Sequence, residues 1–321
     1  MTLKDVAEDA GVALNTARKA LQGDSSVRHY IRDRVIRSAK KLSYTPNILA
    51  RGLRVKSLNL VPISVIKMNE AYFGSLAINI SDCLVSAGFE PLLCTQPSRL
   101  IEINKTLHSC ACIFCYAVDE TMVRSLANSQ KVVTINAPEY SIHNAGNVIC
   151  DFDSGYIDAT NYVISTGRTR VAILSDYYTE CVELGKPLLK FGKVPETLAD
   201  SGLKLVSPRN VPSFRNEAEL ADFLSRSRKN KVDAVFCEND VIAAKLYSIL
   251  ASMGYRIPED VLIIGCDANI PLEGCLSMKI DCADIAKKAV SVLRKLFEGE
   301  GKSIIELSIP YLVNSKGKRI I

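Results

Sequence analysis

The sequence predicts an α/β protein that consists of a small N-terminal three-helix head, a hinge, and a larger core with two parallel-sheet subdomains. Three observations predict this class. The chain of 321 residues is longer than one ordinary α/β domain. Helically spaced apolar residues run through the first 45 positions, and apolar strands alternate with amphipathic helices after residue 56. We therefore assign residues 1–45 to the head, 46–56 to the hinge and 57–321 to the core.

The charge of the chain is concentrated in the head and hinge. Residues 1–56 contain 12 Lys and Arg against 5 Asp and Glu, a net charge of +7. The rest of the chain contains 28 basic and 30 acidic residues, a net charge of −2. A small cationic head on a nearly neutral body favours a polyanion as the partner of the head. A basic surface that is merely solvated is the alternative.

The composition excludes several classes of protein. Hydrophobic residues make up 48% and charged residues 23% of the chain, which is typical of a soluble globular protein. No apolar run approaches the roughly 20 residues that cross a bilayer. The N-terminus turns polar too early for a secretory signal. We expect a cytoplasmic protein without membrane contact, and its 11 cysteines should be reduced thiols.

The head begins with a short capped helix. Thr2 and Asp5 have the spacing of a capping box, and the apolar residues from Leu3 to Ala10 recur at helical intervals. Gly11 can take the left-handed conformation that a tight turn between helices requires. This pattern predicts about two helical turns followed by a sharp turn.

Two further helices complete a helix-turn-helix, one from about Leu14 to Leu21 and one from about Arg28 to Leu42. In that geometry the second helix enters the major groove of DNA, where solvent-facing residues at its start reach base edges. The candidates for base contacts are Leu14, Asn15, Arg18 and Lys19. Thr16 and Gln22 lie where phosphate contacts set the register, and Thr2 is counted with these DNA-binding candidates. A generic three-helix bundle has the same core periodicity, so periodicity alone does not decide between the two.

The head and hinge resemble those of the LacI/GalR family of transcription regulators. The resemblance is carried by Thr2 to Val12, by Thr16, by Leu42 to Asn47 and by Ala50 to Leu53. It implies a repressor that binds a near-palindromic operator as a homodimer. It also implies that a hinge from about Pro46 to Val55 becomes helical on double-stranded operator DNA. The hinge candidates for DNA contact are Asn47, Ala50, Arg51 and Leu53, with Leu53 as a wedge in the minor groove.

The residues of the hinge fit this role. Pro46 is a good first helical residue, but a segment of about ten residues that contains Gly52 is too short to be helical alone in water. An apolar wedge between base steps kinks the duplex and allows additional contacts. A plain basic linker is the alternative.

The head departs from the family at its second helix. Ala13 stands where the family usually has Ser, and Ala17-Arg18-Lys19 replaces the usual V-S-R. Loss of a Ser cap costs about 1 kcal/mol of helix stability. We therefore expect an operator that differs from those usual for the family.

The core contains eight predicted strands, and apolar strands separated by helices indicate buried parallel sheets. They are Leu58–Ile66, Glu90–Cys94, Cys110–Tyr116, Val132–Asn136, Arg170–Ser175, Leu203–Val206, Ala234–Cys237 and Val261–Gly265. Two such sheets with a cleft between them fit the length of the core.

The core also resembles the ligand domain of the same family, which is similar to periplasmic sugar-binding proteins. Asp151 to Gly155, Gly167 to Ala172, Glu238 to Ala243 and Gly254 to Asp267 carry this resemblance. It implies that the chain crosses between subdomains near residues 150, 280 and 308, with a small-molecule effector in the cleft. The polar candidates for effector binding are Asn136, Asn239 and Asp267, and Tyr72 and Phe73 are candidates for stacking on a ring. A capping or loop-stabilising role is the alternative for each of them.

The core lacks groups that the family often uses to grip a sugar. Val182 stands where an Arg is often found, and the polar groups expected near Ile280 and Asn314 are missing. Either the effector is less polar than a sugar, or the protein responds to no small molecule.

Other chemistry receives little support from the sequence. His108, Cys110, Cys112 and Cys115 could suggest a metal site, but a core strand with buried thiols is the simpler interpretation. No catalytic motif emerges, so we expect neither an enzyme nor a metal or other cofactor. A cytoplasmic solute-binding module whose head contacts proteins is the alternative function. A carbohydrate enzyme would require carboxylates paired across the cleft, which a sequence does not reveal.

Overall fold

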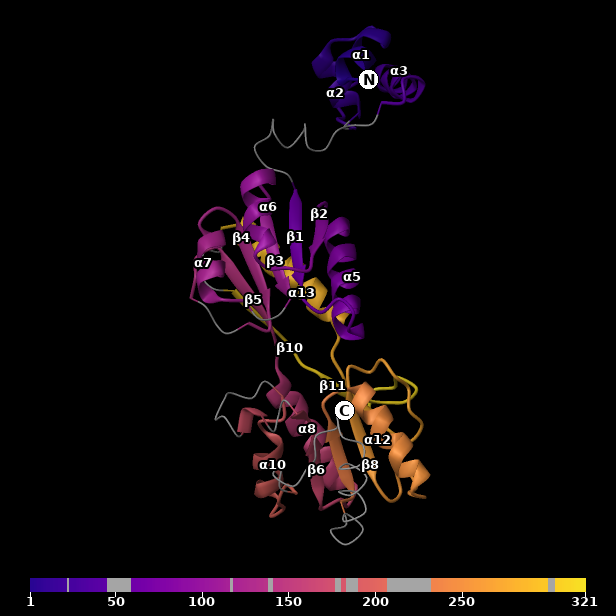
Figure 1. Cartoon of the computed structure of the whole chain (residues 1–321). Coiled ribbons are helices and arrows are strands. Elements are labelled where there is room, and N and C mark those ends of the chain that lie inside the picture. Colours follow the sequence, from indigo (N-terminus) through magenta and orange to yellow (C-terminus); the bar gives the residue numbers. More distant parts are fainter. Residues whose placement is uncertain are drawn as a thin grey trace. The chain divides into compact units, whose positions relative to one another are not determined.

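The computed structural model describes residues 1–21, 23–44, 59–115, 118–137, 141–176, 180–182, 190–206, 232–299 and 304–321. The chain forms two compact units, Met1–Leu58 and Asn59–Ile321 (Figure 1). The predicted hinge at 46–56 lies outside the described residues. In the described part of the chain, no helix is long and apolar enough to cross a membrane.

The first unit contains the three predicted helices, α1 (Leu3–Asp9), α2 (Leu14–Leu21) and α3 (His29–Lys41). The capping box is present, because the Asp5 amide donates to Thr2 Oγ1 and the Thr2 amide donates to Asp5 Oδ2. Gly11 has a φ of +57°, the left-handed conformation that the turn requires. Small and β-branched side chains from all three helices form one buried core, so the unit is a closely packed helix-turn-helix.

The second unit contains two sheets, each within its own subdomain. The strands of the first sheet are β1 (Leu60–Val65), β2 (Glu90–Cys94), β3 (Ala111–Cys115), β4 (Lys131–Ile135), β5 (Ala145–Cys150) and β10 (Ile304–Ser308). Within the described residues their order is β10-β5-β4-β3-β1-β2, and all neighbouring pairs are parallel. The sheet is thus buried on both faces, as parallel sheets usually are.

Helices cover both faces of this first sheet. α5 (Ala71–Ser86) and α13 (Cys282–Phe297) share one face with the side chains of Ile63 and Val133. α6 (Arg99–Leu107) and α7 (Glu120–Ala127) pack on the opposite face against Phe114 and its neighbours. Alternate residues of β3 therefore point to different helix layers, as the period of a strand requires.

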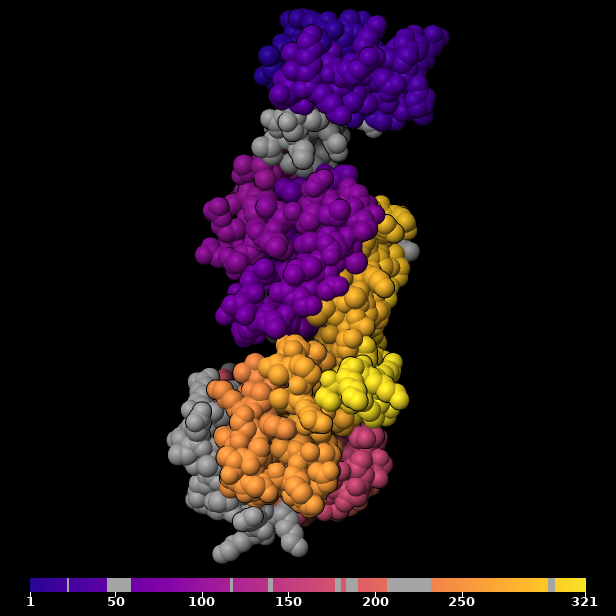
Figure 2. All heavy atoms as spheres, turned by 90° about the vertical axis from the view of Figure 1, so that its right-hand side faces the viewer, coloured from indigo at the N-terminus to yellow at the C-terminus, as the bar shows by residue number. Residues whose placement is uncertain are grey.

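The second sheet has the order β11-β9-β8-β7-β6 within the described residues. Its strands are β6 (Val171–Leu174), β7 (Ala234–Cys237), β8 (Leu262–Cys266), β9 (Leu276–Lys279) and β11 (Tyr311–Asn314), and only β11 runs antiparallel to its neighbour. The flanking helices are α8 (Phe152–Ser165), α10 (Val194–Asp200) and α12 (Asp240–Ser252). The last residues of the chain, yellow in Figure 2, lie against this orange subdomain.

One predicted strand is wrong, and four observed strands were not predicted. Residues Leu203–Val206 form no strand, and only one backbone bond, from Val206 N to Val171 O at 2.8 Å, connects them to β6. The strands that were not predicted, β5, β9, β10 and β11, contain polar residues or glycine among their apolar ones. They extend because neighbouring strands pair with them, which a local pattern does not reveal.

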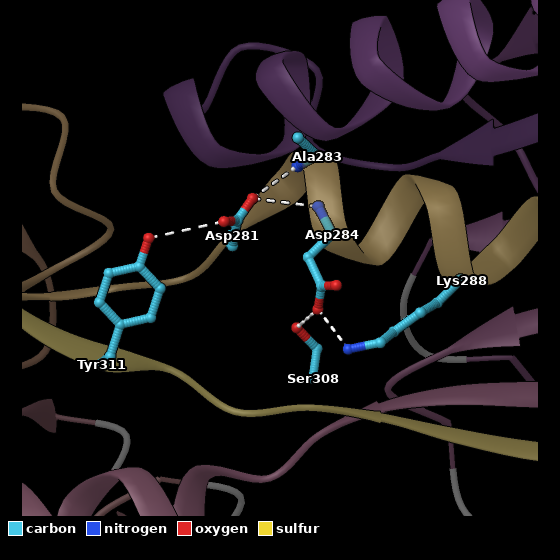
Figure 3. A network of polar contacts seen from close by, with 6 residues as sticks. All are labelled: Asp281, Ala283, Asp284, Lys288, Ser308 and Tyr311. Carbon is cyan, nitrogen blue, oxygen red and sulfur yellow. Dashed lines mark hydrogen bonds and ion pairs between the residues drawn. The ribbon is translucent and has the colours of Figure 1, made fainter.

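The chain passes between the two sheets after β5, after β9 and after β10. Asp281 caps α13 by accepting hydrogen bonds from Ala283 N and Asp284 N, and it also accepts one from Tyr311 Oη at 3.5 Å (Figure 3). Asp284 Oδ2 accepts a hydrogen bond from Ser308 Oγ at 2.6 Å. These contacts connect the second crossover to the third.

Candidate nucleic-acid interface and ligand cleft

The helix-turn-helix presents one face of α2 to solvent. Leu14 is 44% exposed and Asn15 is exposed, whereas Ala17 and Ala20 are buried in the core of the head. Lys19 is partly exposed and lies on the same side of the helix as Asn15, one turn further on. The start of α2 is therefore available for contact, and its opposite face holds the head together.

A hollow of about 330 Å³ lies beside this face. Asn15, Thr16 and Lys19 line one side of it, and Ser26, Val27, Arg28 and Ile31 line the other. Three of the predicted DNA-binding residues thus lie together with a further arginine that the sequence analysis did not select. Arg28 immediately precedes α3, and it was treated only as the start of that helix.

Four candidates already have partners in the head, and one of them is Lys19, whose Nζ lies 3.8 Å from Asp24 Oδ2. Arg18 Nη1 donates to Asn15 Oδ1 at 3.2 Å, which leaves the amide NH₂ of Asn15 free to point elsewhere. Thr2 Oγ1 is engaged in the capping box. Gln22, Asn47, Ala50, Arg51 and Leu53 lie outside the described residues.

The acidic residues of the head are largely neutralised within it. Hydrogen bonds from Thr2, Lys41 and Ser26 lower the pKa of Asp5, Asp9 and Asp24, respectively. Lys41 Nζ lies 2.6 Å from Asp9 Oδ1, and Ser38 Oγ also donates to this carboxylate. The carboxylates therefore stay ionised at neutral pH, and the head retains an excess of basic side chains for an anionic partner.

A cavity of about 220 Å³ lies between the two subdomains of the second unit. It is lined by Lys67, Glu70, Tyr72, Phe73, Asn136, Phe152, Lys190, Glu238, Asn239, Asp267 and Ile280. All five predicted effector-binding residues line this cavity. Ile280 contributes apolar surface, and no arginine is among the described lining residues. Val182, 46% exposed, is not part of the lining.

Two of the predicted residues hold the local structure together. Asn136 Oδ1 accepts a hydrogen bond from Cys150 N at 2.7 Å, and Asn136 Nδ2 donates to Cys150 Sγ at 3.3 Å, so its amide joins the ends of β4 and β5. Asn239 Oδ1 accepts from Ile242 N at 3.0 Å and caps α12. The capping alternative therefore describes the contacts of both side chains.

Asp267 lies in a loop that a buried carboxylate supports. Asp267 and the next residue, Ala268, have positive φ angles of +94° and +53°. Asp240, only 2% exposed, holds this loop by accepting hydrogen bonds from Asn269 N at 2.7 Å and Ile270 N at 3.2 Å. Burial raises the pKa of Asp267, and the positive charge of Lys190 offsets part of that rise.

Lys190 is the most informative residue that the sequence analysis missed. Its Nζ lies 5.4 Å from the centre of the Phe152 ring, 3.5 Å from Glu238 O and 3.4 Å from Cys266 Sγ. Ser175 Oγ in turn donates to Glu238 Oε2 at 2.9 Å. Phe152 and Glu238 lie in motifs that carry the family resemblance. Lys190 lies in no motif, and no sequence signal places it in the cleft.

Metal binding finds no support in the described part of the chain. No three His, Cys, Asp or Glu side chains gather there into a group that could hold a metal ion. Cys112 and Cys115 are buried within β3, where burial raises the pKa of both thiols, and His108 is exposed. All eleven cysteines are free thiols.

Both units of the chain are similar to known protein families. Residues 2–47 match the family of bacterial regulatory proteins named lacI, and residues 161–314 match the periplasmic binding protein-like domain. The "HTH-type transcriptional repressor PurR" of Photobacterium profundum is 24% identical over 96% of this chain and 98% of its own.

Solved structures share the fold. A lac repressor dimer bound to operator and the anti-inducer ONPF superposes with a TM-score of 0.76 and 16% identity over 99% of this chain and 98% of that one. The complex of the transcriptional regulator CelR with cellobiose superposes with a TM-score of 0.63 and 19% identity over 99% of both chains.

Proposed function

We infer that this chain, whose residues 2–47 match the lacI family of bacterial regulatory proteins, represses transcription as a homodimer on a near-palindromic operator. The capped helix-turn-helix with the exposed start of α2 carries this inference, because it combines the family motif with the geometry that reads a major groove. Relatives of this chain are transcription regulators, and the protein would act in the cytoplasm, where the DNA is.

We propose distinct roles for the residues of the head. Asn15 and Lys19 would contact base edges, as amide and ammonium groups do with adenine and guanine. Thr16 and Arg28 would contact phosphates from the two sides of the hollow and fix the register. Leu53 of the hinge would enter the minor groove as a wedge.

The cleft is the proposed site for a small-molecule effector that changes the affinity for DNA. Its position between two subdomains and its mixed aromatic and charged lining support this role. No arginine is among the described lining residues, so this part of the lining lacks the guanidinium fork that grips sugar hydroxyls or carboxylates.

The decisive experiment measures binding of the full-length protein to fragments of its own genomic neighbourhood at two salt concentrations. Wild type is compared with Leu53→Ala and Lys19→Ala, and Lys105→Ala, an exposed lysine on α6, serves as the matched control. We expect the wild-type protein to bind selectively and its affinity to fall as the salt concentration rises. Leu53→Ala and Lys19→Ala should both weaken binding, whereas Lys105→Ala should not. If the folded protein shows no selective binding even at low salt, the proposed function is wrong and a solute-binding module becomes the better hypothesis.

A further inference from the structure

We propose that the cleft recognises a small organic ammonium ion, and that the Lys190 side chain occupies this ammonium site as a tethered competitor. This proposal rests on the proposed function, in which the cleft holds the effector, and it specifies the chemical class of that effector. It also assigns Lys190 a regulatory role.

The surroundings of Lys190 Nζ combine the groups that bind an ammonium. The aromatic face of Phe152 lies 5.4 Å away, a distance at which a cation is attracted to the ring. The carbonyl oxygen of Glu238 at 3.5 Å and Cys266 Sγ at 3.4 Å accept hydrogen bonds from it. An ammonium has three donors and no acceptor, so these partners match its chemistry.

The charges of the cleft also favour a cation. Glu70, Glu238 and Asp267 contribute three carboxylates to the lining, against the ammonium groups of Lys67 and Lys190. Lys67 Nζ is paired with Glu70 at 3.0 Å, so its charge is compensated at the same place. If Lys190 left the cleft, the cation remaining among the described lining residues would be Lys67, which is paired with Glu70, and no further lysine there would face the carboxylates of Glu238 and Asp267.

The rest of the lining suits an apolar body attached to the ammonium group. Tyr72 and Phe73 lie edge to face with their ring centres 5.0 Å apart, and Ile280 adds aliphatic surface. A short alkylammonium would place its charge where Lys190 Nζ lies and its chain against these side chains. The cavity of about 220 Å³ has room for such a molecule.

A tethered group competes strongly with a free one. A side chain linked to its own site acts at an effective concentration in the millimolar range or higher, so a free amine at lower concentration displaces it only in part. Wild-type protein should therefore bind amines weakly. Removal of the Lys190 ammonium should improve their binding by about tenfold, which corresponds to about 1.4 kcal/mol.

The test compares wild type with Lys190→Met and with the matched control Lys193→Met. Lys193 is close in sequence, but its Nζ pairs with Glu196 at 2.7 Å and it does not line the cavity. Binding of n-butylammonium is measured by calorimetry and thermal unfolding at constant ionic strength, with n-butanol as the neutral probe and butyrate as the anionic one. Lys190→Gln is a second variant that preserves a polar side chain.

We expect Lys190→Met and Lys190→Gln to bind n-butylammonium about tenfold more tightly than wild type and the control do, with no such gain for n-butanol or butyrate. Adding Asp267→Asn to Lys190→Met should abolish the gain. Equal binding by all variants, or a gain that is the same for n-butanol, would overturn the proposal. So would unfolding of both Lys190 variants, since a displaceable group cannot be essential for the fold. None of these measurements involves DNA, so they can fail while operator binding stands.

Discussion

Replacement of Asp240 by alanine should release the loop that carries Asp267 into the cleft. The Asp240 carboxylate is buried and accepts three hydrogen bonds, two from the amides of Asn269 and Ile270 and one from Ser277 Oγ at 2.7 Å. The Asp240→Ala change leaves all three donors without this acceptor, the two amides in part-buried surroundings and Ser277 Oγ in buried ones. Because the loop includes two residues with positive φ, its conformation depends on such support.

The magnitude follows from these contacts. A hydrogen bond to a charged group contributes about 1.5–3 kcal/mol, but part of this sum is offset because burial disfavours the carboxylate and raises the pKa of Asp240. Leaving a buried donor without its acceptor costs about 1–3 kcal/mol, and Ser277 Oγ is the most buried of the three donors. We therefore expect Asp240→Ala to lower the unfolding free energy of the second unit by about 4 kcal/mol, which is roughly a 10 °C decrease in Tm.

The assay is urea and thermal unfolding followed by circular dichroism. Asp158→Ala, at an exposed position of α8, is the control and should change the unfolding free energy by less than about 0.5 kcal/mol. Asp240→Asn should fall between the two, because the amide retains one acceptor oxygen. An effect of Asp240→Ala below about 1 kcal/mol would refute the argument that this carboxylate holds the loop.

Three further predictions concern the head and the crossovers. Thr2→Ala removes the capping box and should lower the unfolding free energy of the head by about 1 kcal/mol in urea titrations; an unchanged midpoint would count against the cap. The pKa values of Asp9 and Asp24 in the folded head lie below the ordinary 3.8. The contribution of these two carboxylates to the stability of the head is therefore complete above about pH 4, and it is lost as the pH falls through their folded pKa values. Acid titration of the head by circular dichroism should show this loss, and Asp9→Asn should reduce it. In Gly155→Ala the new Cβ would lie 2.6 Å from Pro310 O, so this variant should lose about 1–3 kcal/mol of unfolding free energy, whereas Gly74→Ala, with ordinary contacts, should lose none. Equal stability of the two glycine variants would contradict the close approach at the third crossover.

The residues of the head determine its structure almost entirely through local signals. The capping pair Thr2 and Asp5, the left-handed Gly11 and the helical spacing of apolar residues all act within a few positions of the chain. The three helices therefore appear at the predicted places, within one residue at each end. Seven strands of the core were also predictable, because a continuous run of apolar residues is typical of a strand in a parallel sheet.

The sequence also indicated which residues line the cleft, because chemically active side chains follow the ends of parallel strands. Asn136 follows β4, Asn239 follows β7 after one residue, and Asp267 follows β8, and all three line the cavity. The cap that Asn239 forms on α12 is local, but the contact of Asn136 with Cys150, fourteen residues away, was not predictable. Whether an amide caps a helix or faces a ligand depends on the positions of donors elsewhere, such as the Cys150 amide that Asn136 binds.

Only the tertiary structure decided the roles of β10, β11 and Lys190. β10 and β11 adjoin in the chain but pair with strands of different sheets, and these partners are distant in sequence. Lys190 meets Phe152, Glu238 and Cys266, which are 38, 48 and 76 positions away along the chain. Contacts between residues so far apart produce no periodic pattern in the sequence, because the chain must fold before the contacting groups come together.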